Sequence, residues 1–355
     1  MNRPMRASGL VDVEDLGAWP VRLDARSPSE YADDHLPGAT SAPVLDDDER
    51  ALVGTLHARE GAFEAKKVGA ALVARRIAGI VDTLARGRPR DWAPLVYCWR
   101  GGKRSGALAH VLREIGFPAA QLAGGYRAWR RYVLARLATL PSALDLRVIC
   151  GVTGSGKSRL LVALAAEGAQ ALDLEALAKH RGSLLGDRPG DPQPSQRAFE
   201  TALYEALASF DRSRPVYVES ESRRIGALQV PDALIERMRA APCVRVDLGC
   251  AQRIALLKEE YAHFLDDPDA LAARLGHLKA LHGAATIERW SALARERAFD
   301  PLVAELLEQH YDPTYTRAMT RNYAGYAAAT ALAPAGIDED AFRATARALA
   351  AGADR

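Results

Sequence analysis

Cysteine is scarce in this sequence. Four cysteines occur among 355 residues, at positions 98, 150, 243 and 250, with neither a C-x-x-C pair nor a Cys/His cluster. A disulfide framework and a Cys/His metal site are therefore not expected, and reduced thiols point to the cytoplasm. Long apolar runs are also lacking. No apolar stretch approaches the roughly 20 residues that a helix needs to cross a bilayer. The first residues lack the apolar core of a signal peptide, so we expect a cytoplasmic protein without a membrane partner.

Net charge is nearly absent as well, at +2, but the charge is unevenly distributed. Residues 75–131 contain twelve Lys and Arg side chains against three acidic ones. This basic excess is typical of a surface that binds a polyanion, although a solvated charged face has the same composition. The candidate RNA-binding residues are Arg127, Arg130 and Arg131.

The apolar content, 48%, is enough for a large core, and the length favours two domains. Two successive patterns of short apolar strand, turn and amphipathic helix meet near Pro141. We predict an α/β fold with one domain over residues 1–140 and a second over 141–355. The second domain is expected to become almost wholly helical from Ala251, with a terminal helix or a frayed tail after Tyr326.

Short apolar runs and helical periodicity locate the main elements of both domains. In the first domain we predict strands over residues 21–26 and 94–99 and a helix over 105–116. In the second we predict strands over 144–150, 214–220 and 243–248, within one parallel sheet, and a helix over 159–168.

Cys98 lies in a loop that is typical of reactive thiols. It opens the run Cys-Trp-Arg-Gly-Gly-Lys-Arg-Ser, after a predicted strand and just before a predicted helix. The two glycines allow backbone N–H groups to turn inward at the positive end of the helix dipole. Three cations follow the cysteine, namely Arg100, Lys103 and Arg104. We predict that Cys98 and these cations are catalytic, and that Cys98 is a nucleophile or a chalcogen carrier.

The spacing from Cys98 to Arg104 is also C-x5-R, the signature of cysteine phosphatases. In such loops the amides and the arginine grip a phosphate. Chemistry on a phosphate or a chalcogenophosphate is therefore open at this point.

Residues 151–158, GVTGSGKS, satisfy the phosphate-loop pattern G-x-x-x-x-G-K-[ST] between a predicted strand and a predicted helix. The predicted phosphate-binding residues are Gly151, Thr153, Gly154, Ser155, Gly156, Lys157 and Ser158. Loop amides would cradle phosphate oxygens, Lys157 would neutralise them, and Ser158 is a candidate Mg²⁺ ligand. Glu219, at the end of a predicted strand, is either a Walker B-like carboxylate or a surface side chain. A phosphate loop indicates a phosphate ligand and not nucleotide hydrolysis.

Two segments around the Cys98 loop resemble a rhodanese domain. VRLDARSPSEYADDHLPGATSAPV (21–44) is similar to its opening segment and AAQLAGGYRAW (119–129) to its closing segment. With the Cys98 loop they cover nearly all of residues 12–134. Rhodaneses carry sulfur or selenium on this cysteine, so the resemblance favours a chalcogen carrier over a phosphatase.

The order of a rhodanese-like domain and a P-loop domain, with several further motifs, resembles one family, the tRNA 2-selenouridine synthases. The matching segments are residues 47–50, 53–54, the Cys98 loop, 151–158, 173–175, 179–183, ESESRRIG at 219–226, and YDPTY at 311–315. The resemblance spans residues 12–320. One departure is Trp99, where the family often has a small residue after the cysteine.

The resemblance implies that selenium replaces sulfur in the wobble 2-thiouridine of tRNA, through an S-geranyl-2-thiouridine intermediate. It implies three partners: tRNA, geranyl diphosphate and selenophosphate. No tightly bound cofactor is expected, and Mg²⁺ is the candidate ion. Further substrate-binding residues would be Asp173, His180, Arg181 and Arg223, which alternatively form solvated charged ends of helices and strands.

Other functions remain open on the sequence alone. An ATP-dependent sulfurtransferase or kinase acting on RNA would use Lys157 and Glu219 for nucleotide hydrolysis. A non-enzymatic RNA-binding protein and a cysteine phosphatase are further alternatives. Steady ATP turnover stimulated by tRNA would distinguish the first of these.

Overall fold

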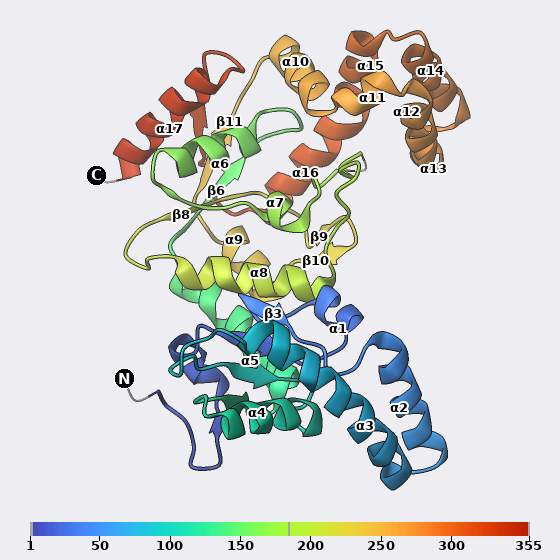
Figure 1. Ribbon diagram of the computed structural model, residues 1–355. Coiled ribbons are helices and arrows are strands. Elements are labelled where there is room, and N and C mark those ends of the chain that lie inside the picture. The colour runs from blue at the N-terminus through green and yellow to red at the C-terminus, as the bar shows by residue number, and fades with distance from the viewer. Residues whose placement is uncertain (1–2, 184, 354–355) are drawn as a thin grey trace. The chain divides into compact units, whose positions relative to one another are not determined.

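The computed structural model describes residues 3–183 and 185–353. Contacts within the chain separate two compact units (Figure 1). Unit 1 consists of Met1–Arg136 and Pro194–Thr201, and unit 2 of Leu137–Gln193 and Ala202–Arg355. No helix among the described residues is both long and apolar enough to span a membrane.

Unit 1 is built on a five-stranded parallel sheet. In spatial order its strands are β1 (Leu10–Val11), β5 (Ala120–Leu122), β4 (Leu95–Tyr97), β2 (Arg22–Asp24) and β3 (Ala39–Ser41). All three residues of β4 are buried, as expected for a central strand of a parallel sheet covered on both faces. Cys98, the residue that follows this strand, therefore lies at the carboxyl edge of the sheet.

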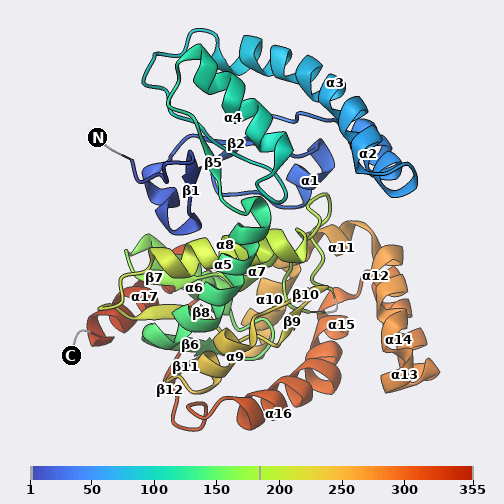
Figure 2. The same cartoon turned by 90° about the horizontal axis from the view of Figure 1, so that it is seen from below.

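The helices of unit 1 lie along the chain between and after its strands (Figure 2). They are α1 (Pro28–Asp33), α2 (Asp47–Arg59), α3 (Ala62–Ile80) and α4 (Lys103–Ile115), followed by α5 (Gly125–Thr139), which continues into unit 2. Helix α4 buries Leu108 and Leu112 against Val96 of β4 and ends at Gly116, whose φ of 108° is left-handed. The helix after the Cys98 loop is thus anchored by its apolar face, and its first turn adjoins the loop.

Unit 2 contains a second five-stranded parallel sheet. Its order is β12 (Thr330–Leu332), β11 (Cys243–Val246), β6 (Leu146–Cys150), β8 (Val216–Glu219) and β7 (Gln170–Leu172). A short antiparallel pair, β9 (Arg224–Ile225) and β10 (Leu228–Gln229), follows β8. The prediction that the chain is almost wholly helical beyond Ala251 is wrong at β12, which pairs in parallel with β11.

Helices make up most of the rest of unit 2. They are α6 (Lys157–Ala166), α7 (Leu174–Ala178), α8 (Gln196–Ser209), α9 (Asp232–Arg239), α10 (Cys250–Glu260), α11 (Ala262–Asp266), α12 (Pro268–Leu275), α13 (Lys279–His282), α14 (Ala284–Arg295), α15 (Phe299–Leu306), α16 (Asp312–Asn322) and α17 (Glu339–Ala353). A π-helical stretch, Leu307–Tyr311, joins α15 to α16. Helix α8 begins in unit 1 and ends in unit 2.

Two apolar cores hold unit 2 together. In the first, the C-terminal helix α17 packs on α6 through Phe342 and Ala346 (Figure 1). In the second, α11, α12, α14 and α15 enclose Trp290, which has no exposed surface. The P-loop helix is therefore covered by the end of the chain, and a separate helical core lies beyond α10.

Candidate functional site

Two anion-binding loops, one in each unit, are the candidate sites. In unit 1, Cys98 follows β4 and its side chain is 3% exposed. Ser105, in the first turn of α4, donates a hydrogen bond from Oγ to the Cys98 Sγ at 3.1 Å. Gln121 in turn donates from Nε2 to the Ser105 Oγ at 2.9 Å and to the Gly101 carbonyl oxygen at 2.7 Å. The sulfur is thus held by a fixed polar chain between α4 and β5.

The segment that the sequence identified as the rhodanese closing motif shapes the Cys98 loop. The backbone N–H of Tyr126 donates to the Cys98 carbonyl oxygen at 2.9 Å, and that of Arg127 to Trp99 at 3.0 Å. Gly125 has a φ of 59°, and a Cβ there would overlap the Cys98 carbonyl oxygen. Only glycine therefore fits at this position. Trp99 packs its ring near Tyr126, with 5.3 Å between centroids.

The three predicted cations of the loop differ in their surroundings. Arg100 and Lys103 are exposed, so both are free to meet an anionic ligand. Arg104 instead pairs with Glu30 at 2.7 Å, and its side chain is only 16% exposed. The glutamate also caps α1 through the backbone N–H of Ser27, so Arg104 ties α1 to α4. A ligand of Arg104 would have to replace or share this carboxylate.

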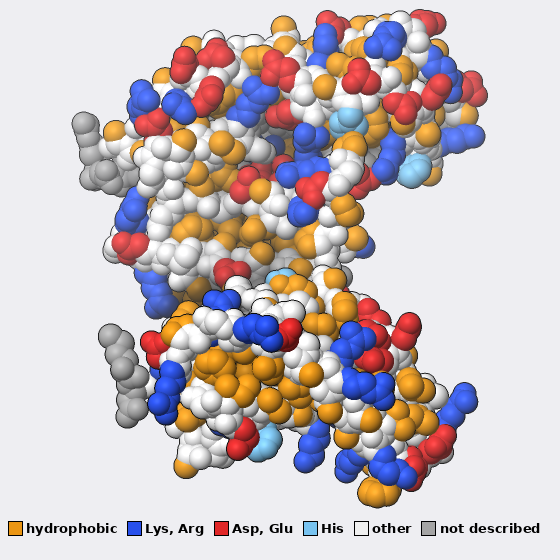
Figure 3. Space-filling view, viewed as in Figure 1, with side chains coloured by type: hydrophobic (Ala, Val, Ile, Leu, Met, Phe, Trp, Pro, Cys, Tyr) orange, Lys and Arg blue, Asp and Glu red, His pale blue; other side chains and the backbone are white. Residues whose placement is uncertain are grey.

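The predicted RNA-binding arginines also separate into two kinds. Arg127 and Arg131 are exposed on α5. Arg130 does not fit the expectation of an RNA-binding residue, because its side chain is 12% exposed and forms ion pairs with Glu200 and Asp34. Asp34 also accepts hydrogen bonds from Tyr126 and Thr201, so this cluster fixes the start of α8 to unit 1. On the face drawn in Figure 3, basic and acidic side chains are intermixed.

In unit 2 the P-loop lies between β6 and α6, as predicted. Lys157 donates from Nζ to the Gly151 carbonyl oxygen at 2.9 Å and lies over the ring of Tyr315, 4.8 Å from its centroid. Ser155 is fully buried and its Oγ lacks a hydrogen-bond partner among the described residues. Gly156 has a φ of 83° and faces the ring of Phe342, which a Cβ would overlap.

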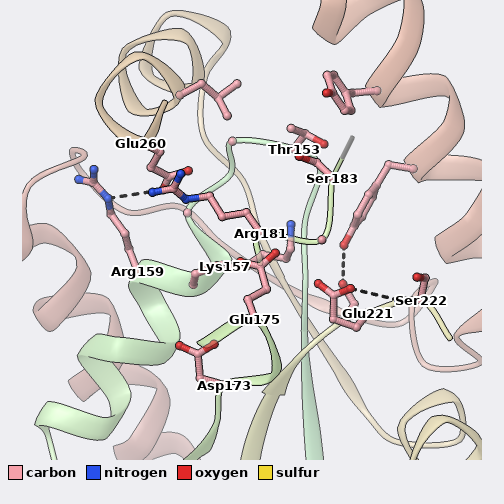
Figure 4. Close-up of a pocket in the computed structure, with 18 of the residues that line it drawn as sticks. Thr153, Lys157, Arg159, Asp173, Glu175, Arg181, Ser183, Glu221, Ser222 and Glu260 are labelled. Atoms are coloured by element: carbon pink, nitrogen blue, oxygen red, sulfur yellow. Dashed lines mark hydrogen bonds and ion pairs between the residues drawn. The ribbon is translucent and has the colours of Figure 1, made fainter. Parts of the chain in front are cut away.

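A cavity of about 740 Å³ opens beside the P-loop (Figure 4). Among the predicted residues, Thr153, Gly154, Gly156, Lys157, Ser158, Asp173 and Arg181 line it. Figure 4 shows Lys157, Glu175 and Arg181 converging on the same space. Its charged lining is mixed, with Lys157 and five arginines against five acidic side chains. Such a lining is suited to an anionic ligand that binds together with a cation.

Several cavity arginines have donors available. The Nε groups of Arg188, Arg239 and Arg343 are buried and have no hydrogen-bond partner among the described residues. All three side chains line the cavity. Buried donors without a partner are costly, and an anionic ligand would satisfy them.

Three glutamates lie close together beside the P-loop. Carboxylate oxygens of Glu175, Glu219 and Glu221 lie within 4.8 Å of one another. Ser158 donates from Oγ to Glu219 Oε2 at 2.9 Å, whereas the buried Oε1 has no partner among the described residues. Glu219 has no exposed surface, which excludes the surface carboxylate considered from the sequence.

Burial, together with the neighbouring carboxylates, disfavours charge on these glutamates. It raises the pKa of Glu175 to about 8, with Glu221 as the next cause, and the pKa of Glu221 to about 8, with Glu219 as the next cause. The pKa of Glu219 is raised well above its ordinary value. A bound divalent cation would relieve this repulsion, because carboxylate oxygens are the ligands that such ions prefer.

The remaining predicted substrate residues do not line the P-loop cavity. His180 is 5% exposed and its Nε2 lies 3.3 Å from Asp187, while its Nδ1 accepts from the Gly182 N–H at 3.1 Å. Burial lowers its pKa, so a neutral ring that shapes the loop replaces the expected electrostatic clamp. Arg223 is exposed and pairs with Asp232 at 2.5 Å.

The sequence prediction missed several cavity residues. The sequence spacing could have identified Glu221. It stands two residues after Glu219 at a strand end, and side chains at this spacing point to the same side of a strand. Arg239, at the end of α9, has no local signal. Tyr315 and Asp312 lie on α16. Asp312 pairs with Arg253 of α10, whose Nε donates to the Thr153 carbonyl oxygen at 2.9 Å.

Comparisons with known proteins match both units. Residues 13–132 match the family model of the rhodanese-like domain, and residues 144–279 match that of the tRNA 2-selenouridine synthase AAA domain. These matches confirm the predicted order of a rhodanese-like domain and a P-loop α/β domain.

Curated relatives match along most of the chain. A tRNA 2-selenouridine synthase of Nitrosomonas europaea is 35% identical over 75% of this chain and 70% of its own. Two further tRNA 2-selenouridine synthases match over a longer span. That of Hahella chejuensis is 34% identical over 82% of this chain and 84% of its own. That of Marinobacter nauticus is 30% identical over 84% of this chain and 88% of its own. The resemblance read from the motifs is thereby confirmed, and the chain belongs to the tRNA 2-selenouridine synthase family.

Proposed function

We propose that this protein replaces sulfur by selenium in the wobble 2-thiouridine of tRNA, with geranyl diphosphate and selenophosphate as co-substrates. The observation that carries the proposal is the presence of two different candidate anion sites in one chain of this family. One is a loop that contains the Cys98 thiol, and the other is a P-loop cavity without a thiol among its described lining residues. A two-step exchange needs both kinds of site.

The first step is geranyl transfer at the P-loop. The thiocarbonyl sulfur of the base attacks C1 of geranyl diphosphate, the carbon–oxygen bond breaks, and diphosphate leaves with the electron pair. The loss of the N3 proton of the base keeps the product neutral. Lys157, the loop amides and the arginines of the cavity, including Arg181 and Arg239, stabilise the charge that develops on the leaving group.

A divalent cation of the Mg²⁺ class is part of this proposal. Glu175, Glu219 and Glu221 would hold it together with Ser158, and the unpartnered Glu219 Oε1 supports the fit. When bound, the cation would neutralise part of the charge on the diphosphate. The six cationic side chains of the cavity would hold the remaining oxygens.

The second step is selenium delivery at the Cys98 loop. Geranylation turns the sulfur into a thiolate leaving group, so C2 of the base becomes open to a selenium nucleophile. The selenium of selenophosphate adds to C2, the carbon–sulfur bond breaks, and geranylthiolate leaves and takes up a proton. Water then attacks phosphorus, the phosphorus–selenium bond breaks, and phosphate leaves. Cys98 assists this displacement, with Arg100 and Lys103 available for the phosphate group.

The polyanionic partner is tRNA. Arg127 and Arg131, which are exposed near the Cys98 loop, are proposed to contact its phosphates. Their position supports this assignment, because both follow directly on the segment that holds the loop in place.

Mass spectrometry of wobble nucleosides tests the proposed function. The full chain is incubated with thiolated tRNA and both co-substrates, and 2-selenouridine is expected. Omission of selenophosphate should leave S-geranyl-2-thiouridine. If 2-thiouridine persists unchanged when both co-substrates are present, the proposal is wrong. Steady ATP hydrolysis stimulated by tRNA would instead support the ATP-dependent sulfurtransferase or kinase.

A further inference from the structure

An apolar slot lies next to the P-loop cavity, within the helical part of unit 2. Its volume is about 60 Å³, and its wall includes Leu257 of α10, Phe264 of α11, Leu271 of α12, and Leu302 and Val303 of α15. Phe264, Leu271 and Leu302 are at most 8% exposed and belong to the core around Trp290. The slot is thus a gap at the edge of a packed core and not an exposed groove.

The slot and the P-loop cavity are continuous. Four residues line both of them, namely Thr153, Leu257, Tyr261 and Tyr311. Thr153 is a residue of the P-loop itself, so the mouth of the slot lies at the place where a phosphate group would bind. Arg253 ties α10 to this loop through the Thr153 carbonyl oxygen, which fixes the slot relative to the P-loop.

The chemistry of the slot differs sharply from that of the cavity. Among the described residues that line the slot, Lys258 alone carries a charge, and its Nζ pairs with Asp300 at 2.5 Å. No carboxylate is among them. A ligand that spans both spaces must therefore have a strongly anionic end and an apolar end.

We propose that the slot holds the far end of a prenyl chain whose diphosphate is bound by the P-loop. This inference rests on the proposed geranyl transfer, and it assigns the tail to α10, α11, α12 and α15. A ten-carbon chain places its first isoprene unit in the larger cavity, below Tyr261 and Tyr311, and its second in the slot. Because the slot is small, it would also limit the chain length.

Calorimetric binding tests the slot with two ligands, geranyl diphosphate and inorganic diphosphate, in the full chain. The wild type should bind the prenylated ligand about tenfold or more tightly, because burial of the chain adds to the binding of the diphosphate. Val303→Trp fills the slot from its partly exposed side and should abolish this difference while leaving inorganic diphosphate binding unchanged. Leu281→Trp is the matched control, because Leu281 is 66% exposed in the same helical part.

Leu271→Ala provides a test that does not depend on the folding of Val303→Trp. It enlarges the slot and should shift preference toward a fifteen-carbon prenyl diphosphate. If Val303→Trp keeps the wild-type difference, or if Leu271→Ala leaves the chain-length preference unchanged, the tail lies elsewhere. A wild type that binds inorganic diphosphate but gains nothing from the prenyl chain overturns the slot alone. A wild type that binds neither ligand overturns the proposed P-loop role as well.

Discussion

Phe342 of the C-terminal helix offers a direct test of how the P-loop is supported. Its ring is 1% exposed, belongs to the core with Leu160, Leu161 and Leu164 of α6, and faces Gly156 of the P-loop. Phe342→Ala removes this ring and leaves a cavity in a packed core. We expect a loss of about 3–5 kcal/mol in the free energy of unfolding of unit 2. Diphosphate binding should weaken too, because the loop loses the surface that supports Gly156.

Urea unfolding combined with hydrogen exchange measures this loss in each unit separately, since a chain with two units need not unfold in one step. The midpoint for peptides of α6 should fall by roughly 1–3 M urea, whereas that for peptides of β4 should stay constant. Phe63→Ala is the matched control, because Phe63 is 72% exposed on α3 and its loss should cost less than about 0.5 kcal/mol. A Phe342→Ala protein with wild-type stability of α6 would refute the reasoning.

Four further changes separate the roles of individual residues. Lys157→Ala should weaken inorganic diphosphate binding by about 30-fold or more in calorimetry, since a charge-assisted contact is lost, while the unfolding of unit 1 stays unchanged. Charge reversal of Arg127 and Arg131 should weaken tRNA binding and flatten its salt dependence, and unchanged affinity at low salt would place the RNA site elsewhere. Arg130→Ala should instead destabilise unit 1 by about 3 kcal/mol in urea unfolding, because its carboxylate partners stay buried. Cys98→Ser should accumulate geranylated tRNA in nucleoside mass spectrometry.

The sequence predicted those parts of the fold that depend on neighbouring residues. Residues 94–97 are a continuous apolar run and residues 144–150 are rich in apolar side chains. A glycine-rich loop follows each of them, and both form central strands. Strand β12 has no such signal, because Thr330–Leu332 lies in an alanine-rich stretch and becomes a strand only through pairing with β11. Likewise, nothing local indicates that Pro194–Thr201 belongs with unit 1, where Ser195 donates to the Asp33 carbonyl oxygen at 2.5 Å.

The same distinction holds for the sites. The P-loop is one contiguous motif, so the sequence identifies it completely. The group of three glutamates joins α7 to the end of β8, and its geometry depends on how β7 and β8 pair. His180 follows the phosphate motif along the chain, where a charged residue resembles a ligand, but the fold buries its ring and places Nε2 3.3 Å from Asp187.

The outcome for Cys98→Ser follows from what each chemical step requires. In the proposed geranyl transfer the thiocarbonyl sulfur of the base is already an adequate nucleophile, and the P-loop cavity would stabilise the leaving diphosphate, so no protein thiol is needed. The proposed selenium delivery needs a site for selenophosphate with a thiol beside fixed positive charge. The Cys98 loop would supply both, through the sulfur that Ser105 contacts and through Arg100 and Lys103.

A serine hydroxyl in place of the thiol keeps the size and the hydrogen bond of the side chain but does not supply a thiolate. The variant should therefore form S-geranyl-2-thiouridine at the wild-type rate and little 2-selenouridine, with Cys250→Ser, at an exposed cysteine of unit 2, as the matched control. Equal loss of both products, with folding and tRNA binding intact, would mean that one shared site performs both steps. Loss of neither product would mean that Cys98 is not catalytic, and the selenium site would then have to lie outside the loop.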